Sequence, residues 1–483
     1  MKTPTWLFPS TPLRDRSAPR SGLDRRQLLQ SLGALGATLV LAPRARAQAG
    51  RPSPLWISVQ ASGGWDQALF CDPQPTLRGP YLDRDLYLYG VPVLENGVAA
   101  RGTGIVRNPT AGALRTTPGG GIRYLGFADF HGEPDHAQHP YVPFFPRYFD
   151  RVTVFNGLDA STNNHAVGER YCASGSLNEG GPCVAAQLAC ALGPTRPLTF
   201  LNMGGYGETA GLVPATPMRD SLLPNLLAAV APNDVDGDNA GDDAFLHPDL
   251  LAQVDAAQAR RRAQQRAHLT LPGHQRALAA ASEAAGGGNH LKQLRFRSND
   301  LTMKNLLQVG LEAWRQGLAV SMNVTAGGFD SHEDNEQQQV KALYDTLELL
   351  KLIIDESEQP EGGAAPVPVV ALVSSDFGRT PHRTAGGTDH WPIASMLVLQ
   401  NRPAQALGLA LPTNTTIGGT TDGGVDDALR PRRINPRTLA FDDGGIVPTP
   451  GHVVRVIRRM AGVADHPRLA RFPLSVEGDL NLG

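Results

Sequence analysis

The sequence predicts an α/β fold in which helices cover both faces of a mainly parallel β-sheet. Short apolar, β-branched runs alternate along the chain with longer segments of helical periodicity, a pattern typical of strand–helix–strand units. Three of the apolar runs are also followed by glycine and an acidic residue. Because the carboxyl ends of parallel strands meet at one edge of a sheet, these endings predict a single site assembled from three distant segments.

The elements follow in order from these patterns. The expected strands are apolar runs bounded by turn residues, and they lie within residues 51–70, 152–155, 198–203, 318–324, 368–373 and 393–399. The expected helices lie within 182–192, 250–284 with a break at Pro272, 301–317, 335–358 and 453–461. The helix at 335–358 carries Val340, Leu343 and Leu347 at helical spacing, which suits a helix lying on a sheet.

The domain organisation follows from the distribution of these elements. We expect a single domain over residues 51–483, because no linker forces a boundary and no internal repeat is visible. Long irregular insertions are expected around residues 71–150 and 204–300, where glycine, proline and polar residues interrupt the periodic segments.

Residues 1–47 are interpreted as a twin-arginine export signal. An Arg-Arg pair at 25–26 precedes an apolar stretch at 28–42, and a small-x-small cleavage pattern follows at 45–47. The apolar stretch is too short for a comfortable membrane span. We therefore expect the twin-arginine translocase to export the chain to the periplasm or the extracellular space, with no stable membrane span. An amphipathic helix or an uncleaved anchor is the alternative.

Charge and cysteine content narrow the classes of function. The 483 residues include 44 basic and 46 acidic side chains, for a net charge of −2, which does not favour a nucleic-acid partner. The four cysteines lack the spacing of a zinc or redox cluster, so a redox enzyme ranks last. A disulfide between Cys172 and Cys183 is allowed in an oxidising compartment, but buried structural thiols are the favoured interpretation.

Acidic and imidazole side chains follow the predicted strands and form the candidate metal site. Carboxylate and imidazole groups together suit a divalent metal ion such as Zn, Mn or Ca. The alternatives are a capping role for Asp66 or Asp330, and a turn-forming pair between Asp376 and Arg379. The six candidate ligands are Asp66, Asp330, His332, Asp376, Asp389 and His390.

Further candidates follow the strand at 152–155. Thr162 and His165 bring a hydroxyl and an imidazole, which could serve as a nucleophile, a phosphate contact or a metal ligand. A polar turn followed by a helix cap is the alternative. Arg379 is the candidate for holding an oxyanion, because a guanidinium matches such groups bidentately. Polar clusters at 131–139 and 234–238 are interpreted as loops, the second with at most weak affinity for calcium.

Several motifs in the same order resemble the bacterial domain-of-unknown-function 1501 family, whose members typically carry twin-arginine signals. The resemblance covers most of the mature chain. The motifs are S-G-G-W-D at 62–66, N-H at 164–165, G-G-F-D-S-H at 327–332, D-F-G-R-T at 376–380 and G-T-D-H at 387–390. That family is in turn similar to the alkaline phosphatase and arylsulfatase superfamily, which implies an alkaline-phosphatase/sulfatase-like fold.

The superfamily binds two metal ions, and the resemblance implies how the candidate ligands divide between them. Asp66 and Asp376 would share one ion, while Asp330, His332 and His390 would share the second. Under the same resemblance Asp389 either binds metal or orients its neighbour His390.

The resemblance also implies a function. Phe377 stands where the superfamily often has a metal-binding histidine, and the superfamily nucleophile has its nearest match in Ser161 or Thr162. We therefore expect an exported, metal-dependent hydrolase acting on a phosphate or sulfate ester of a small molecule or a polymer. The alternative is a non-catalytic periplasmic binding or assembly protein on the same fold.

Overall fold

The computed structural model covers the sheet, its covering helices and the C-terminal region. The predicted export signal and the polar clusters at 131–139 and 234–238 lie outside the described residues. The described residues are 53–73, 87–88, 93–95, 98–100, 106–107, 114–125, 144–196, 198–218, 247–268, 303–333, 335–360, 363–384, 387–408, 411–421 and 429–482.

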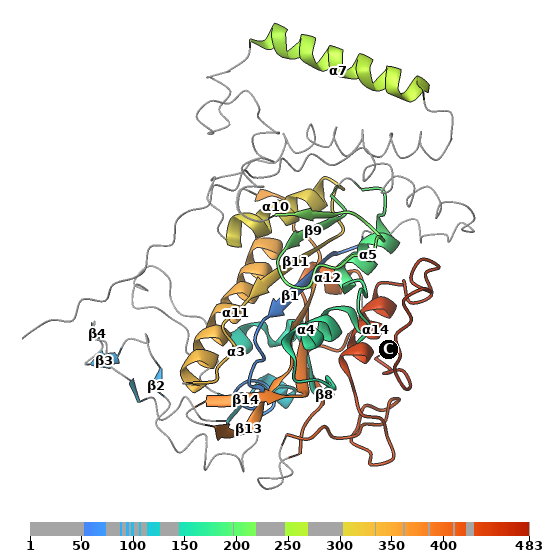
Figure 1. The fold of residues 1–483 in the computed structure, drawn as a ribbon. Helices are drawn as coiled ribbons and strands as arrows, with labels where there is room; N and C mark the ends of the chain where they lie inside the picture. The colour runs from blue at the N-terminus through green and yellow to red at the C-terminus, as the bar shows by residue number, and fades with distance from the viewer. Residues whose placement is uncertain are drawn as a thin grey trace, which may run out of the picture.

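An eight-stranded sheet forms the centre of the fold (Figure 1), in the order β10-β9-β11-β1-β12-β15-β8-β16. Every neighbouring pair is parallel except the two made by β15, which runs antiparallel to β12 and β8. The predicted mainly parallel sheet is therefore confirmed. Its strands are β1 (Leu55–Ala61), β8 (Val152–Asp159), β9 (Phe200–Met203), β10 (Ala215–Pro217), β11 (Ser321–Ala326), β12 (Val369–Ser375), β15 (Ile393–Gln400) and β16 (Thr415–Gly418).

The central strands form because their apolar residues can be buried on both faces. All seven residues of β1 and all seven of β12 are buried. Successive side chains point to opposite faces of the sheet, so Ile57 and Val59 join one core cluster while Trp56 joins the other. Burying such strands requires a cover on each face.

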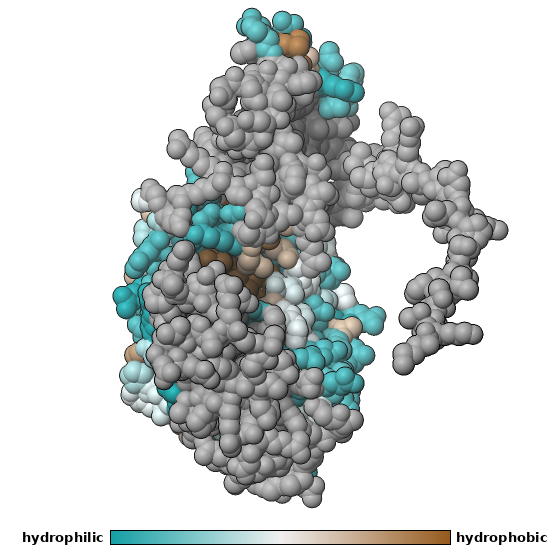
Figure 2. Space-filling model, turned by 90° about the vertical axis from the view of Figure 1, so that its left-hand side faces the viewer, coloured by the Kyte–Doolittle hydropathy of each residue, from teal (hydrophilic) through white to brown (hydrophobic). Residues whose placement is uncertain are grey.

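Helices supply that cover on both faces, as the sequence predicts. α3 (Phe144–Tyr148), α10 (Met303–Arg315) and α11 (Asn335–Glu358) contribute to the first core cluster. α4 (His165–Ser174), α5 (Val184–Leu192), α12 (Arg402–Ala406) and α14 (Pro450–Met460) contribute to the second. Figure 1 shows the two groups on opposite sides of the sheet. Seen from the first side, the coloured part of the surface is mainly hydrophilic, with hydrophobic residues near the middle of the view and at its top (Figure 2).

The described parts of the predicted insertions hold short elements. α7 (Pro248–His268) is the first half of the helix predicted at 250–284, and every residue in it whose burial is described is exposed. Around 71–150 six short strands pair into two-stranded sheets. They are β2 (Tyr87–Leu88), β3 (Val93–Glu95), β4 (Val98–Ala100), β5 (Val106–Arg107), β6 (Leu114–Thr116) and β7 (Arg123–Leu125), with single 3₁₀ turns η1 (Gln67–Leu69), η3 (Pro118–Gly120) and η5 (Phe149–Arg151).

Among the elements that were not predicted, a two-stranded hairpin and helix α4 lie beside the candidate ligands. The segment after Asp376 forms a hairpin of β13 (Gly378–Thr384) and β14 (Gly387–Trp391). A short loop follows β8, and helix α4 begins at His165. Among the helices that the structure describes, none combines the length and the apolar character that crossing a bilayer requires.

Candidate metal centre

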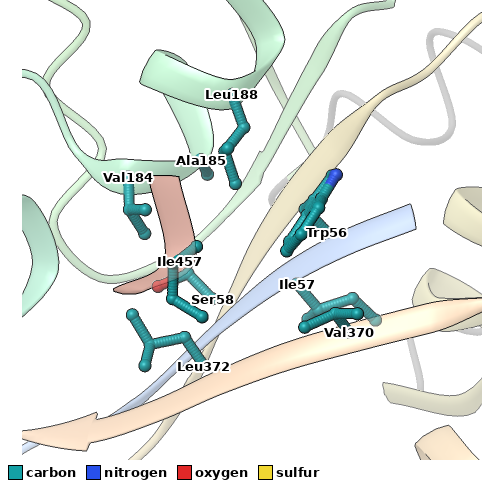
Figure 3. Close-up of a pocket in the computed structure, with 9 residues that line it drawn as sticks. All are labelled: Trp56, Ile57, Ser58, Val184, Ala185, Leu188, Val370, Leu372 and Ile457. Carbon is teal, nitrogen blue, oxygen red and sulfur yellow. The ribbon is translucent and has the colours of Figure 1, made fainter. Parts of the chain in front are cut away.

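A pocket in the described core is apolar and is not a chemical site. Figure 3 shows it between strands β1 and β12 and helices α5 and α14. No titratable side chain lines it, since its walls are Trp56, Ile57, Ser58, Val184, Ala185, Leu188, Val370, Leu372 and Ile457. The pocket is therefore interior packing space, and the candidate site is sought in the polar clusters at the sheet edge.

Parallel register brings the three predicted loops together. Ala61 at the end of β1 lies level with Ala326 of β11 on one side and with Ser375 of β12 on the other. The loops that follow therefore start at the same edge of the sheet. Gly63 allows their close approach, because a Cβ at this position would lie 2.4 Å from the backbone nitrogen of Asp330.

Helix α4 brings His165 to this edge. Asn164 is the N-cap of the helix and accepts a hydrogen bond from Val167 N at 3.2 Å, so His165 is the first helical residue. Gly168 lets the helix lie against β12, since a Cβ there would be 2.2 Å from the Asp376 carbonyl oxygen. His165 Nδ1 consequently lies 2.8 Å from Asp376 Oδ2.

The β13–β14 hairpin brings His390 to the same place. His390 pairs with Arg379 across the hairpin, and its Nδ1 lies 2.7 Å from the carbonyl oxygen of Asn163 in the loop before α4. The buried ring of Phe377 packs against two imidazoles, with its centroid 4.9 Å from that of His165 and 4.5 Å from that of His390.

Three imidazole nitrogens converge on one carboxylate oxygen. Asp330 Oδ1 lies 3.1 Å from His332 Nε2, 3.4 Å from His390 Nε2 and 3.5 Å from His165 Nε2. The Nε2 atoms of His332 and His390 are 3.0 Å apart. Ligands about 2.0–2.1 Å from a tetrahedral zinc ion are separated by about 3.3–3.4 Å, so the distance from Asp330 Oδ1 to each of these nitrogens suits a shared ion. His165, Asp330 and His390 form a first group of possible ligands, whose atoms all lie within 4.8 Å of one another.

The hydrogen bonds behind the imidazoles favour the same interpretation. A proton on Nδ1 of His165 is held by a carboxylate, and one on Nδ1 of His390 by a carbonyl, which leaves the Nε2 lone pairs directed into the cluster. His165 Nε2 is buried, and it makes no hydrogen bond to any residue of the described chain. An orphaned buried nitrogen of this kind is the position that a metal ion would satisfy.

A second group of possible ligands shares His390 with the first. His332, Asp389 and His390 offer atoms within 4.8 Å of one another. Asp389 is largely exposed, its Oδ1 accepts a hydrogen bond from His390 N at 2.8 Å, and it lies 4.0 Å from His332 Nδ1. This carboxylate is therefore on the rim of the cluster.

Arg379 is buried next to the cluster and is not exposed to solvent. Its side chain is fully buried, and its guanidinium donates to the carbonyl oxygens of Gly63, Gly64, Phe329 and Thr388. Nη2 also donates to Asp330 Oδ1 at 2.8 Å. Partial burial of Asp330 works in the opposite direction, but the Arg379 hydrogen bond and charge hold the pKa of that carboxyl below its usual value.

The two remaining predicted ligands have all their oxygens engaged. Asp66 caps η1 by accepting from Ala68 N at 3.0 Å, and its other oxygen accepts from Asn335 at 3.2 Å. Burial raises the pKa of Asp66 to about 6. Asp376 accepts from Gln60 at 3.3 Å, from Gly63 N at 3.0 Å and from His165. In the structure Asp66 therefore caps η1, and Asp376 binds the Nδ1 atom of His165.

The predicted nucleophiles lie in the loop between β8 and α4. Ser161 has a positive φ of 55°, a conformation that is uncommon outside glycine. Its hydroxyl lies 3.2 Å from Asp159 Oδ1. Thr162 Oγ1 accepts from Asn164 N at 3.1 Å. The next residue, Asn163, carries the carbonyl that contacts His390, so both hydroxyls belong to a loop in contact with the cluster.

Gln339 of α11 holds the loops together and was missed by the sequence reasoning. Its side-chain oxygen accepts from Asp66 N at 2.7 Å, while its nitrogen lies within hydrogen-bond distance of Gly64 O, Phe329 O and Ser331 Oγ. A signal was present, because Gln339 occupies the same helical stripe as Leu343 and Leu347. A polar residue on an apolar stripe indicates a buried hydrogen-bonding task.

Fold and cluster together define an α/β protein with a candidate metal centre at the carboxyl edge of its sheet. Comparison of the chain with models of known protein families gave no match, and comparison with curated proteins gave none either. The family resemblance seen in the motifs stays a prediction.

Proposed function

We propose that the protein is a metal-dependent hydrolase of a phosphate or sulfate ester. The observation that carries the proposal is the convergence of three imidazole Nε2 atoms on Asp330 Oδ1 at 3.1–3.5 Å. The place of the cluster, at the carboxyl ends of parallel strands, is where α/β proteins bind ligands. Export through the twin-arginine pathway belongs to the same proposal and rests on the N-terminal sequence.

His165, His332, His390 and Asp330 are the residues that would hold the ion. Three nitrogens and one oxygen suit zinc better than calcium, which prefers oxygen ligands alone. When bound, such an ion polarises an ester oxygen and makes a water or hydroxyl a better nucleophile at neutral pH.

The protein's own groups prepare this centre. Asp376 and the Asn163 carbonyl hold two imidazoles in one tautomer and orientation. Arg379 favours the ionised form of Asp330, which is the form that binds a cation. Ser161 can donate its proton to Asp159 across 3.2 Å, so this hydroxyl is one candidate nucleophile and a water molecule is the other.

Metal analysis and an ester panel test the proposal on the folded, exported protein. The wild type should contain a divalent metal and hydrolyse at least one phosphate or sulfate ester. His390→Ala should lose both properties, whereas His247→Ala should keep both, because His247 is exposed in the segment that begins α7. A wild-type protein with no bound metal and no ester hydrolysis would refute the proposal.

One observation favours a second candidate, a non-catalytic binding or assembly protein. All the described bonds of Arg379 go to main-chain carbonyls and Asp330, so this guanidinium is committed to the fold rather than to an oxyanion. A pull-down from the periplasm discriminates between the candidates. A stable partner that binds wild type and His390→Ala equally well, without ester turnover, would favour this second function.

A further inference from the structure

We propose that the centre takes a single metal ion per chain and that Asp376 is a positioning residue rather than a ligand. This inference rests on the metal site of the proposed function and deepens it, since it assigns a stoichiometry and a role to each acidic residue at the edge of the sheet.

The first step concerns His390, which both groups of possible ligands share. Its Nδ1 contacts the Asn163 carbonyl at 2.7 Å, and its Nε2 lies 3.4 Å from Asp330 Oδ1. Both ring nitrogens are therefore committed once the ion at Asp330 is bound. His332 Nε2 faces the same ion, so the second group is left with His332 Nδ1 and Asp389, which are too few ligands for a tight site.

The second step concerns Asp376. Its Oδ2 contacts both His165 Nδ1 and Gly63 N, and its Oδ1 accepts from Gln60. Its side chain is almost completely buried, with 4% exposure. A carboxylate that is satisfied in this way holds the imidazole from behind, as outer-shell carboxylates do for metal-binding histidines.

The third step concerns Phe377. Its fully buried aromatic ring contacts His165 and His390. Gly64 lies against the same ring, since a Cβ there would be 2.7 Å from it. An apolar ring offers no ligand atom, and Asp66 is directed to Asn335 instead. Among the described residues, neither Phe377 nor Asp66 therefore supplies a free ligand atom for a second ion.

Metal titration of the chelator-treated full chain tests the inference. With Zn²⁺ alone as the probe, calorimetry should give one site per chain for the wild type. Asp389→Asn is the matched acidic control and should leave stoichiometry and affinity unchanged. Asp376→Asn should keep one site with affinity weakened by about 10–100-fold. Asp376→Ala should be weaker still, because a carboxamide oxygen can accept from His165 Nδ1 and a methyl group cannot.

Cobalt substitution separates a ligand from a positioning residue. The absorption bands of bound Co²⁺ report its coordination, and their shape should be the same in wild type and Asp376→Asn. A changed band shape, two tight Zn²⁺ ions per chain, or loss of one ion in Asp389→Asn would overturn the inference. Circular dichroism shows whether Asp376→Ala folds; if it does not, the wild type and the Asp389→Asn control still decide the stoichiometry.

The outcome is distinguishable from that of the proposed function. Ester hydrolysis by a chain that binds two ions refutes the single-ion inference alone. One bound ion without turnover of any ester refutes the hydrolase alone. A chain that binds no ion refutes both.

Discussion

Replacing Arg379 distinguishes a buried clamp from an oxyanion-binding residue. We expect Arg379→Met to destabilise the folded protein, because this side chain joins the loops after β1 and β11 to the β13–β14 hairpin. An arginine that served only to bind substrate would be dispensable for folding, and its loss would appear in turnover alone.

The expected magnitude follows from the partners that Arg379 leaves behind. The carbonyls of Gly64 and Phe329 keep Gln339 as a second donor. Gly63 O accepts from no other donor in the described chain, and leaving it unsatisfied costs about 1–3 kcal/mol. The charge-assisted bond to Asp330 adds about 1.5 kcal/mol, at the low end because that carboxylate is half exposed. The free energy of unfolding should fall by about 3 kcal/mol.

Urea denaturation of the chelator-treated protein measures this change. Arg379→Lys should lose an intermediate amount, because one ammonium group cannot reach carbonyls on several sides as a guanidinium does. Arg437→Met, at an exposed arginine, is the control and should change little. A loss below about 1 kcal/mol for Arg379→Met, together with greatly reduced turnover, would refute the clamp and restore the oxyanion role.

Three further predictions concern stability, pH and thiols. Glu358→Gln should lower the free energy of unfolding by about 3 kcal/mol, because Arg151 Nε and Nη2 bind this carboxylate at 2.8 and 2.9 Å. Zinc affinity should not change, since the pair lies at the opposite edge of the sheet. A weaker affinity in the zinc titration would contradict this prediction. Burial raises the pKa of Asp66 from 3.8 to about 6, so the folded chain holds this proton more tightly and stability should fall by about 3 kcal/mol as pH rises from about 4 to about 6. Asp66→Asn should remove this contribution to the slope of denaturation midpoints against pH, and Asp72 should keep a contribution of similar size through the same shift; an unchanged slope counts against the buried carboxyl. All four cysteines are buried and free, and burial raises the pKa of each thiol. A thiol reagent should therefore label no cysteine in the folded protein and all four after unfolding. Labelling of only two cysteines after unfolding would indicate a disulfide.

Much of the sheet and its covering helices could be predicted from local patterns. The helix predicted at 335–358 has these same bounds in the structure. All but the first residue of the run at 368–373 belong to β12, and the run at 393–399 lies within β15. Hydrophobic periodicity suffices there because the burial of an apolar face follows from the spacing of side chains along the chain. The hairpin was missed because β13 is polar, contains a proline and lies outside the main sheet.

The candidate site, like the fold, could be predicted from the sequence only in part. The residue types and their places after strands were sufficient to expect Asp330, His332 and His390 near one another, and the structure brings these side chains together. The roles of His165, Asp376 and Asp66 were left open or assigned to metal binding by the resemblance. Their partners are distant in sequence, as in the contact between His165 and Asp376, and no local pattern specifies them.

What the sequence determined by itself was the alternation of buried strands and helices and the gathering of acids and imidazoles at one sheet edge, because both depend on the order of residues along the chain. Only the tertiary structure decided which groups face the cluster and which support it. These roles depend on close backbone approaches, such as those at Gly63 and Gly168. They also depend on which hydrogen-bond partner each buried polar atom finds in the folded chain.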